Sequence, residues 1–229
     1  MIFDFGLCSS AKAVAPASQN TDGVDRQIES SEHTALAGQM ILHPRESSDH
    51  VMFICSGQAI SSIGLTDGRR QIFEVLLPGD LVLWTALFEP MSGRLIEAVD
   101  DLSYRRLKRS KFHALLIDRP GLFDVFMKLS AHKKNECDQL ALTLGRRTAA
   151  QRIARLVLDL AERFAERGLM SHGTFRFPLR QRHVADATGL TPVHTSKVLS
   201  QLRQDKIIDL KNRSITIFDM ARLRQVAGP

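Results

Sequence analysis

Residues 181–203 carry the pattern that most limits how this chain can fold. Val184 and Ala185 belong to one short helical segment, Gly189 follows it, and Pro192 is typical of the first turn of a second helix. In a helix-turn-helix the two helices cross closely, so a small residue is needed at the crossing and a glycine at the turn. Ala185 and Gly189, four residues apart, meet both needs. The pattern therefore predicts a helix-turn-helix near the C-terminus.

The segment after the second helix predicts a wing. Two apolar runs, 207–210 and 215–217, flank the polar tip residues Lys211, Asn212 and Arg213, which is typical of a hairpin. The second helix is expected to lie in the major groove of DNA, where its outward residues read bases and its flanks bind phosphates. The base-reading candidates are Val193, Ser196, Lys197 and Ser200, and the phosphate-binding candidates are Arg180, Arg182, Thr191, Arg203, Lys206, Lys211 and Arg213.

Single residues of this set also have interpretations without DNA. Thr191 can be only a helix N-cap, and Lys197 only a solvated charge. The charge distribution favours the set as a whole: residues 146–229 hold 16 Lys and Arg against 7 Asp and Glu, whereas the rest of the chain is net −3. A basic C-terminal third indicates a polyanionic partner. Thr195 departs from the pattern, because such motifs usually have an apolar residue at that position.

Residues 36–112 have the pattern of short strands. The β-rich run Val51–Cys55 ends at Gly57, Asp67-Gly68 is a strong hairpin signal, and Pro78-Gly79-Asp80 is a second turn. Many short strands at close spacing predict an antiparallel roll or barrel. The residues before them have little periodicity and are expected to form a mobile arm. The predicted division is an arm 1–30, a β-roll 31–117, a long helix 118–147 and a C-terminal domain 148–229.

The long helix has one stripe at steps of three and four residues. At 1.5 Å per residue, a helix over 121–144 is about 36 Å long, which is long for a domain of this size. The middle of the stripe is polar, so one interpretation is a two-fold dimer seam whose polar residues set the register. The alternative is a core helix packed on the sheet. The stripe, and hence the candidate dimerisation set, is Phe126, Leu129, Lys133, Cys137, Leu140 and Leu144.

In this order of elements the chain resembles the family of the cyclic-AMP receptor protein and the fumarate–nitrate regulator, CRP/FNR, over about residues 31–220. The resemblance implies an α+β chain with an N-terminal jelly-roll sensor domain, a dimerisation helix and a C-terminal winged helix. It also implies a cytoplasmic homodimer that acts as a transcription regulator, an activator, at a palindromic promoter site and contacts RNA polymerase. It is carried by the residues 50–57, 77–80 and 144–154 and by the helix-turn-helix.

The family's ligand sites match this chain poorly. Its nucleotide pocket pairs Gly-Glu with a later Arg-Ser or Arg-Thr; here Gly79, Asp80 and Arg94 are the candidate effector residues, and Leu95 follows Arg94 in place of the small polar partner. The iron–sulfur branch needs several N-terminal cysteines, and only Cys8 is there. We therefore expect no cofactor and leave the small-molecule effector open. Haem ligation by a histidine, among His33, His43, His50 and His113, remains an alternative. The family's Glu and Arg base readers are replaced by Val193 and Lys197.

Two further function classes stay open as alternatives. A jelly-roll metalloenzyme needs closely spaced ligands such as His-x-His, and the chain has none, so we expect neither an enzyme nor a metal site. A redox-responsive regulator could act through Cys137, because Lys133 and Lys134 lie close in sequence and would favour a thiolate. Reduced thiols are expected for all three cysteines, Cys8, Cys55 and Cys137, and no apolar run is long enough for a membrane span.

Overall fold

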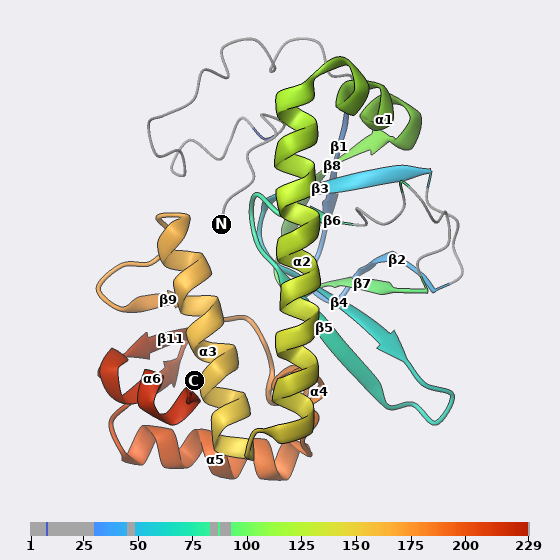
Figure 1. Cartoon of the computed structure of the whole chain (residues 1–229). Coiled ribbons are helices and arrows are strands. Elements are labelled where there is room, and N and C mark those ends of the chain that lie inside the picture. The colour runs from blue at the N-terminus through green and yellow to red at the C-terminus, as the bar shows by residue number, and fades with distance from the viewer. Residues whose placement is uncertain (1–7, 9–29, 45–48, 83–86, 88–92, 229) are drawn as a thin grey trace. The chain divides into compact units, whose positions relative to one another are not determined.

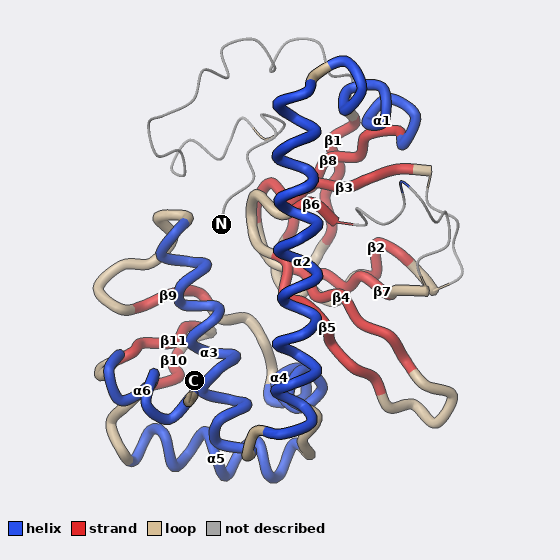
Figure 2. Tube along the Cα trace, viewed as in Figure 1, coloured by secondary structure: helices blue, strands red, loops and turns tan. Residues whose placement is uncertain are grey.

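The strands of residues 31–108 pair into two sheets, in the orders β1-β8-β3-β6 and β2-β7-β4-β5 (Figures 1 and 2). The computed structural model describes residues 8, 30–44, 49–82, 87 and 93–228, so the predicted arm lies almost wholly outside the described residues. The pairs with a defined register are all antiparallel, which confirms the predicted roll. The strands are β1 (Ser31–Ala35), β2 (Met40–Leu42), β3 (His50–Ser56), β4 (Ala59–Gly64), β5 (Arg70–Leu76), β6 (Leu81–Val82), β7 (Leu95–Ala98) and β8 (Leu102–Lys108).

Strand β3 is apolar at nearly every position because both of its faces are buried. Met52 and Ile54 lie in one apolar cluster, between the two sheets, whereas Val51 and Phe53 lie in a second one. Successive side chains of a strand point to opposite faces, so a continuous apolar run suits a strand with a core on each side. The second cluster lies between β3 and the helices that follow the roll.

The helices after the roll close this second cluster. Helix α1 (Arg109–Asp118) contributes Phe112, and α2 (Pro120–Arg146) contributes Phe126; the two rings meet edge to face with centroids 6.0 Å apart. Pro120 opens α2, as expected of a residue that lacks an N–H and has a fixed φ. The first part of α2 is thus anchored to the roll by large aromatic side chains.

The C-terminal elements form a second set around their own core. They are α3 (Ala149–Glu166), β9 (Thr174–Arg176), α4 (Gln181–Thr188), α5 (Pro192–Gln204), β10 (Ile208–Lys211), β11 (Ser214–Ile217) and α6 (Met220–Ala227). A reciprocal capping box between Thr148 and Gln151 starts α3. The antiparallel sheet β10-β11-β9 packs its Phe175 against Phe164 of α3, with ring centroids 4.9 Å apart. Together with the roll, this winged helix-turn-helix confirms the predicted α+β class.

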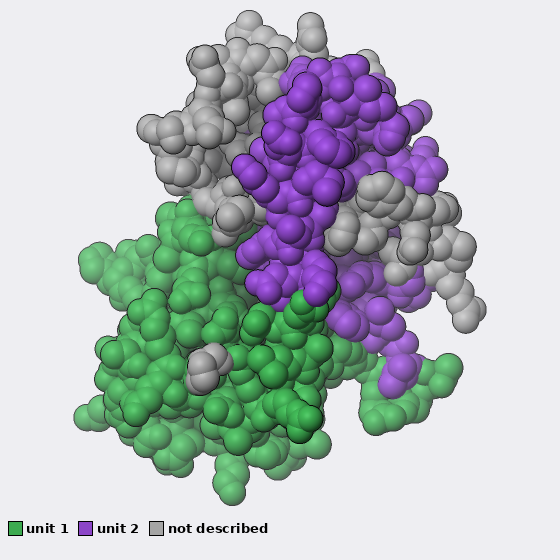
Figure 3. Space-filling view, in the orientation of Figure 1, with its two compact units in different colours: residues 1, 66–72, 137–229 green, residues 2–65, 73–136 purple. Residues whose placement is uncertain are grey.

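Internal contacts divide the chain into two compact units (Figure 3). Unit 1 comprises residues 1, 66–72 and 137–229, and unit 2 comprises residues 2–65 and 73–136. The boundary cuts α2, and the tip of the β4–β5 hairpin groups with unit 1. In the described part of the chain, no helix is both long enough and apolar enough to cross a membrane.

The expectation of three reduced thiols is wrong for two of them. Cys8 and Cys55 are joined by a disulfide bond, and only Cys137 of the three is a free thiol. The sequence gives no sign of this pairing, because 47 residues separate the two cysteines and their approach is set by tertiary folding.

Candidate nucleic-acid interface

The crossing of α4 and α5 depends on two small residues. Ala185 is buried at the crossing, and Gly189 has φ of +64° where the chain turns out of α4. A Cβ on Gly189 would lie 3.2 Å from Leu144 Cδ2, so a larger residue would be both strained and crowded. Arg152 of α3 donates from Nη1 to the carbonyl oxygen of Thr188, at the end of α4. The turn of the helix-turn-helix therefore packs against the end of α2 and the start of α3.

Thr195 is fully buried between the two helices, at the position where an apolar residue was expected. Its Oγ1 finds no hydrogen-bond partner among the described residues. Thr188, the other buried threonine of the motif, donates from Oγ1 to the carbonyl oxygen of Val184 at 2.7 Å. The two threonines thus differ in one respect that matters for stability, namely whether the buried hydroxyl is satisfied.

We expect Thr195→Val to stabilise the C-terminal domain. The change keeps the shape of the side chain and removes a buried hydroxyl without a partner, which is worth about 1 kcal/mol and raises the melting temperature by about 2–4 °C. The matched control is Thr188→Val, which removes a satisfied hydroxyl and should lower the melting temperature. Calorimetry of both variants checks this, and a lower melting temperature for Thr195→Val would show that the hydroxyl has a partner in solution.

The outward face of α5 presents three of the four base-reading candidates to solvent. Val193 is 81% exposed, and Lys197 and Ser200 are also exposed. The fourth candidate, Ser196, is half-buried, and its Oγ accepts a long hydrogen bond of 3.5 Å from Gln181 Nε2 of α4. The opposite face of α5, with Thr195, Leu199 and Leu202, is buried. The helix is anchored on one side and leaves a polar stripe on the other.

Sequence reasoning missed His194, which lies beside Val193 and is exposed. The signal that could have found it is its position in the first turn of α5, the end of a recognition helix that contacts bases. Its backbone N–H donates to Thr191 Oγ1 at 3.2 Å, so Thr191 is the N-cap of α5. The hydroxyl of Thr191 is therefore used inside the protein, and this residue fits a phosphate contact less well than the basic residues around it.

The basic candidates differ in how far the protein itself uses them. Arg203 Nε pairs with Asp209 Oδ1 at 3.0 Å, and Arg182 Nε lies 3.1 Å from His183 Nε2. Arg180 and Lys206 are exposed near the two ends of the motif. All four side chains lie at the surface of unit 1, but those of Arg182 and Arg203 already have a contact within the protein.

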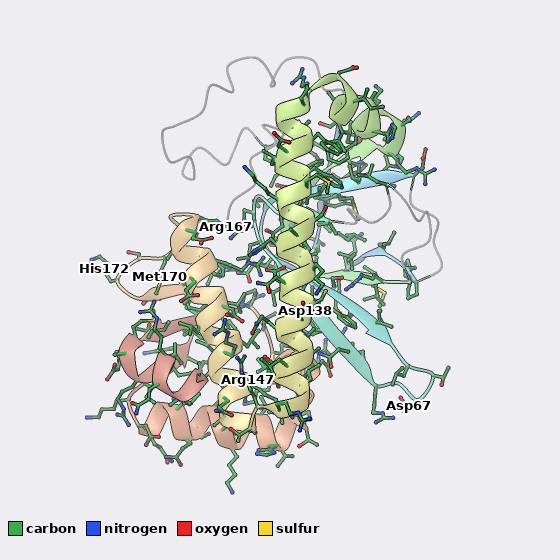
Figure 4. The ribbon with its side chains drawn as sticks, in the orientation of Figure 1. Asp67, Asp138, Arg147, Arg167, Met170 and His172 are labelled. Carbon is green, nitrogen blue, oxygen red and sulfur yellow. A yellow bond between two sulfur atoms is a disulfide. The ribbon has the colours of Figure 1, made fainter. Side chains whose placement is uncertain are left out.

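Other basic residues of the C-terminal third have purely structural positions. Arg147 and Arg167 are buried (Figure 4). Arg147 Nη1 donates to Thr143 Oγ1 at 2.8 Å, and Arg167 Nη1 donates to the carbonyl oxygen of Arg163 at 2.9 Å. The net charge of this third therefore overstates the charge available at its surface.

The wing is a two-residue hairpin between β10 and β11. Lys211 pairs with Ser214, and the two turn residues, Asn212 and Arg213, have φ of +52° and +59°. Positive φ at both turn positions is the geometry of a type I′ turn, which matches the twist of the strands but strains a residue such as arginine. Lys211 and Arg213 are both exposed at this tip.

The structure corrects the dimer-seam interpretation for the first three residues of the α2 stripe. Phe126 and Leu129 are buried in the protomer's own second cluster, and the amine of Lys133 bonds Glu74 of β5 and, at 3.0 Å, Glu136. For these residues the alternative, a helix packed on the sheet, is correct. The physical reason is that Phe126, Leu129 and Lys133 face the roll, where their side chains already have partners. Leu144 packs near Gly189, Leu140 is half-buried, and Cys137 is exposed.

A second face of α2 is apolar and exposed. Phe123 is 48% exposed, Met127 is 50% exposed and Leu142 is 45% exposed. With the exposed Ala131, these residues lie along one side of the helix: Phe123, Met127 and Ala131 follow one another at about one turn, and Leu142 comes about three turns after Ala131. In Figure 3 the unit 2 part of α2 faces the viewer. We call Phe123, Met127, Ala131 and Leu142 the outer stripe of α2.

The candidate effector residues have separate partners. Asp80 is buried, and its Oδ2 accepts from the N–H of Leu77 at 2.7 Å, which closes the turn that includes Gly79, at φ +91°. Arg94 Nη1 donates to Ser61 Oγ at 3.3 Å, and its guanidinium lies 4.7 Å from the ring centroid of Phe73. Asp80 thus has a structural task in a turn, and Arg94 lies against β4 and β5.

The histidines of the roll have ordinary protein partners. His33 stacks on Tyr104 with ring centroids 5.4 Å apart. His50 Nδ1 lies 3.4 Å from Arg106 Nη2, and its burial, together with the nearby Arg106 charge, lowers the pKa of His50. Among the described residues there is no group of three or more His, Cys, Asp or Glu side chains that could hold a metal ion.

The tip of the β4–β5 hairpin contacts α4 within unit 1. Arg70 Nε pairs with Asp186 Oδ2 at 2.7 Å, and Gln71 Nε2 donates to the carbonyl oxygen of Ala187 at 3.1 Å. Asp67 lies at the end of this hairpin (Figure 4), where its hydrogen bonds from Arg69 lower the pKa of Asp67. Residues of the roll's hairpin therefore touch the first helix of the helix-turn-helix, across 116 residues of sequence.

Known proteins share both parts of this arrangement. Residues 32–119 match the model of the cyclic nucleotide-binding domain, and residues 151–226 match that of the Crp-like helix-turn-helix domain. The transcriptional activator protein FnrL of Cereibacter sphaeroides is 31% identical over 201 residues, which cover 84% of this chain and 78% of that protein. The nitrogen fixation regulation protein FixK of Azorhizobium caulinodans is 30% identical over 181 residues, 78% of this chain and 72% of that protein.

Solved structures agree with this fold. FixK2 from Bradyrhizobium japonicum superposes with a TM-score of 0.79 at 27% identity, over 87% of this chain and 98% of that chain. A CRP-family transcriptional regulator from Thermus thermophilus, with a TM-score of 0.70 at 21% identity, covers 86% of this chain and 97% of its own. The similarity extends over the roll, the long helix and the winged domain, in the same order along the chain.

Proposed function

The chain belongs to the CRP/FNR family of transcription regulators, as its sequence resemblance predicted, and on that premise we propose that it acts as a homodimer that binds a palindromic promoter site. In the cytoplasm, it would activate transcription there by contacting RNA polymerase. We assign residues 31–117 as sensor domain, 118–147 as dimerisation helix and 148–229 as DNA-binding domain, preceded by an N-terminal arm, 1–30.

The outward face of α5 carries this proposal. Val193, Lys197 and Ser200 are exposed on a helix whose other side is fixed in the core of unit 1. A rigid helix with a free polar stripe can enter the major groove without rearrangement, and Lys197 can donate to guanine N7 or O6. The wing places Lys211 and Arg213 where they can bind phosphates beside the groove.

The outer stripe of α2 supplies the dimer contact in this proposal. Its apolar side chains are exposed in the single chain, whereas Phe126 and Leu129 on the other side of the helix are already buried. A long helix with exposed apolar residues along one side is suited to pack on its two-fold mate, since a C2 interface uses the same surface on both subunits. Two α5 helices would then face successive major grooves, about 34 Å apart.

Arg213→Gly tests the wing, because stability and DNA binding should change in opposite directions. Glycine relieves the strained φ of +59°, so we expect the domain to gain about 0.5–1 kcal/mol. The lost charge should weaken binding to all DNA sequences alike and reduce the slope of log K against log salt by about 0.9. Lys211→Ala is the control: it should lower the same slope without the gain in stability. An unchanged slope in both variants would show that the wing does not touch DNA.

Cyclic nucleotides are not the effector in this proposal. Asp80 stands where the family has the pocket's glutamate, and it is committed to the N–H of Leu77. We expect millimolar cyclic AMP or cyclic GMP to leave the melting temperature unchanged, with 5′-AMP as the control. A ligand at 100 times its Kd would add about 2.7 kcal/mol. A rise of several degrees with either cyclic nucleotide, but not with 5′-AMP, would contradict the prediction.

A further inference from the structure

The disulfide bond between Cys8 and Cys55 lies within unit 2, at the edge of the second apolar cluster. Cys55 is buried at the end of β3, whereas Cys8 is half-buried and packs against the cluster. We propose that Cys8 and Cys55 are a redox-responsive thiol pair of the sensor domain, oxidised by a hydroperoxide and reduced by a cellular dithiol.

The backbone brings the two sulfur atoms together without deforming the sheet. Strand β3 pairs with β8 through Ile54↔Tyr104 and Ser56↔Ser103, so Cys55 is the extra residue of a β-bulge. Bulges re-aim a side chain out of the regular alternation of a strand. The two Cα atoms are 5.3 Å apart, which is an ordinary separation for a disulfide. The bond can therefore form and break while β3 keeps its place between β8 and β6.

A redox role fits better than a purely structural one, and this step rests on the proposed function. A protein that acts on chromosomal DNA shares a compartment whose thiol pool is kept reduced, where disulfides are mostly transient and redox-sensing. Stability alone does not call for the bond, because unit 2 has two apolar clusters of its own, and a chain of 229 residues can bury a sufficient core.

The chemistry balances with one peroxide for each bond. The thiolate of Cys8, the less buried of the two, attacks a peroxide oxygen; the O–O bond breaks, and the products are a sulfenic acid at Cys8 and, for hydrogen peroxide, water. The thiol of Cys55 then attacks the Cys8 sulfur, which forms the S–S bond and releases a second water. Two cysteines lose two electrons and two protons, and the peroxide is reduced to two waters. A dithiol reverses the change by thiol–disulfide exchange.

The bond reaches the helix that carries the proposed dimer contact. Cys8 packs on the same cluster that holds Phe126 and Leu129, the inner face of α2. In the oxidised state Cys8 is tied covalently to Cys55 beside this cluster, and in the reduced state that bond is absent. The oxidation state is thus communicated to the packing beneath α2, whose outer stripe lies on the other side of the same helix.

Thiol mapping of the full chain is the first test. The reduced protein is treated with a small excess of hydrogen peroxide, alkylated, and digested without reductant. In the wild type we expect a disulfide-linked peptide that contains Cys8 and Cys55, while Cys137 remains a thiol and is alkylated. In Cys55→Ser we expect a sulfenic acid at Cys8, which dimedone traps. Cys137→Ser is the matched control and should form the bond as the wild type does. The proposal is overturned if Cys8 and Cys55 are both still alkylated after the peroxide treatment, or if Cys8 is linked to Cys137 instead.

Reversibility is the second test, and it does not depend on DNA. In buffers with graded ratios of reduced to oxidised glutathione, we expect the Cys8–Cys55 bond to pass from oxidised to reduced within the range of glutathione redox potentials found in cells. We expect the melting temperature to fall by at least about 5 °C when the bond is reduced. The Cys8→Ala variant, which cannot form the bond, should have the same melting temperature in all buffers. A bond that stays oxidised throughout is structural and contradicts the proposal. Thiols that cycle in a protein that binds no DNA would refute only the proposed function.

Discussion

Met127→Glu is expected to be a monomer that binds its DNA site about 10²–10⁴ times more weakly than the wild type. Met127 is half-exposed in the centre of the outer stripe of α2, with Phe123 one turn before it and Ala131 one turn after it. A carboxylate there would be buried against its two-fold mate without a partner. Because the two half-sites are then bound independently, the gain from bivalent binding is lost.

The control for this variant is Gln139→Glu, which adds the same charge to the same helix. Gln139 is exposed but lies about a third of a turn round the helix from Met127. Light scattering should give the mass of a dimer for Gln139→Glu and of a monomer for Met127→Glu, and circular dichroism should show both folded. A dimeric Met127→Glu protein would show that the outer stripe is not the seam.

Lys197→Ala is expected to relax the base preference at one position of each half-site by roughly 1–3 kcal/mol. Lys197 is exposed on the outward face of α5, one turn after Val193, and its ammonium is the strongest hydrogen-bond donor among the base-reading candidates there. Its loss removes discrimination at the base it contacts and leaves other positions of the site unchanged. Binding to a library with single randomised positions measures the effect.

Arg180→Ala separates base reading from phosphate binding in the same library. Arg180 is exposed at the N-terminus of α4, outside the face of α5. We expect this variant to weaken all sequences about equally and to reduce the salt slope, with no change in preference. A Lys197→Ala profile identical to that of Arg180→Ala would mean that Lys197 contacts only the backbone of DNA.

The local parts of the fold were predictable from the sequence because local chemistry determines them. Ala185, Gly189 and Pro192 give the helix-turn-helix, since a close crossing, a positive φ and a first helical turn each restrict the residue type. The hairpin at Asp67-Gly68 and the wing follow from the same logic. The continuous apolar run of β3 also indicated a strand, although not that it would have a core on each face.

The stripe of α2 shows where periodicity stops being informative. Spacing shows that Phe126 and Leu129 share a side of the helix, but not whether that side meets the protomer's own roll or a second copy. The roll provides the partner for these two residues, so for them the alternative of a helix packed on the sheet is correct. The outer stripe was not predictable from spacing because Lys134 and Asp138 lie between Ala131 and Leu142 and interrupt the apolar pattern.

Contacts between residues distant in sequence account for the rest. The Arg70–Asp186 pair and the Cys8–Cys55 bond each depend on how separate elements pack, and no local rule predicts them. The contact of the Lys133 amine with Glu74 of β5 is of the same kind, and the same amine also bonds Glu136.

Selection of bound duplexes from a random library, with the mass of the resulting complex, tests the central claim most directly. The account predicts an enriched palindrome whose two half-sites are about 10–10.5 base pairs apart, centre to centre, bound by two copies of the chain. Enrichment of no sequence over bulk competitor, or of a single half-site bound by one copy, would contradict it.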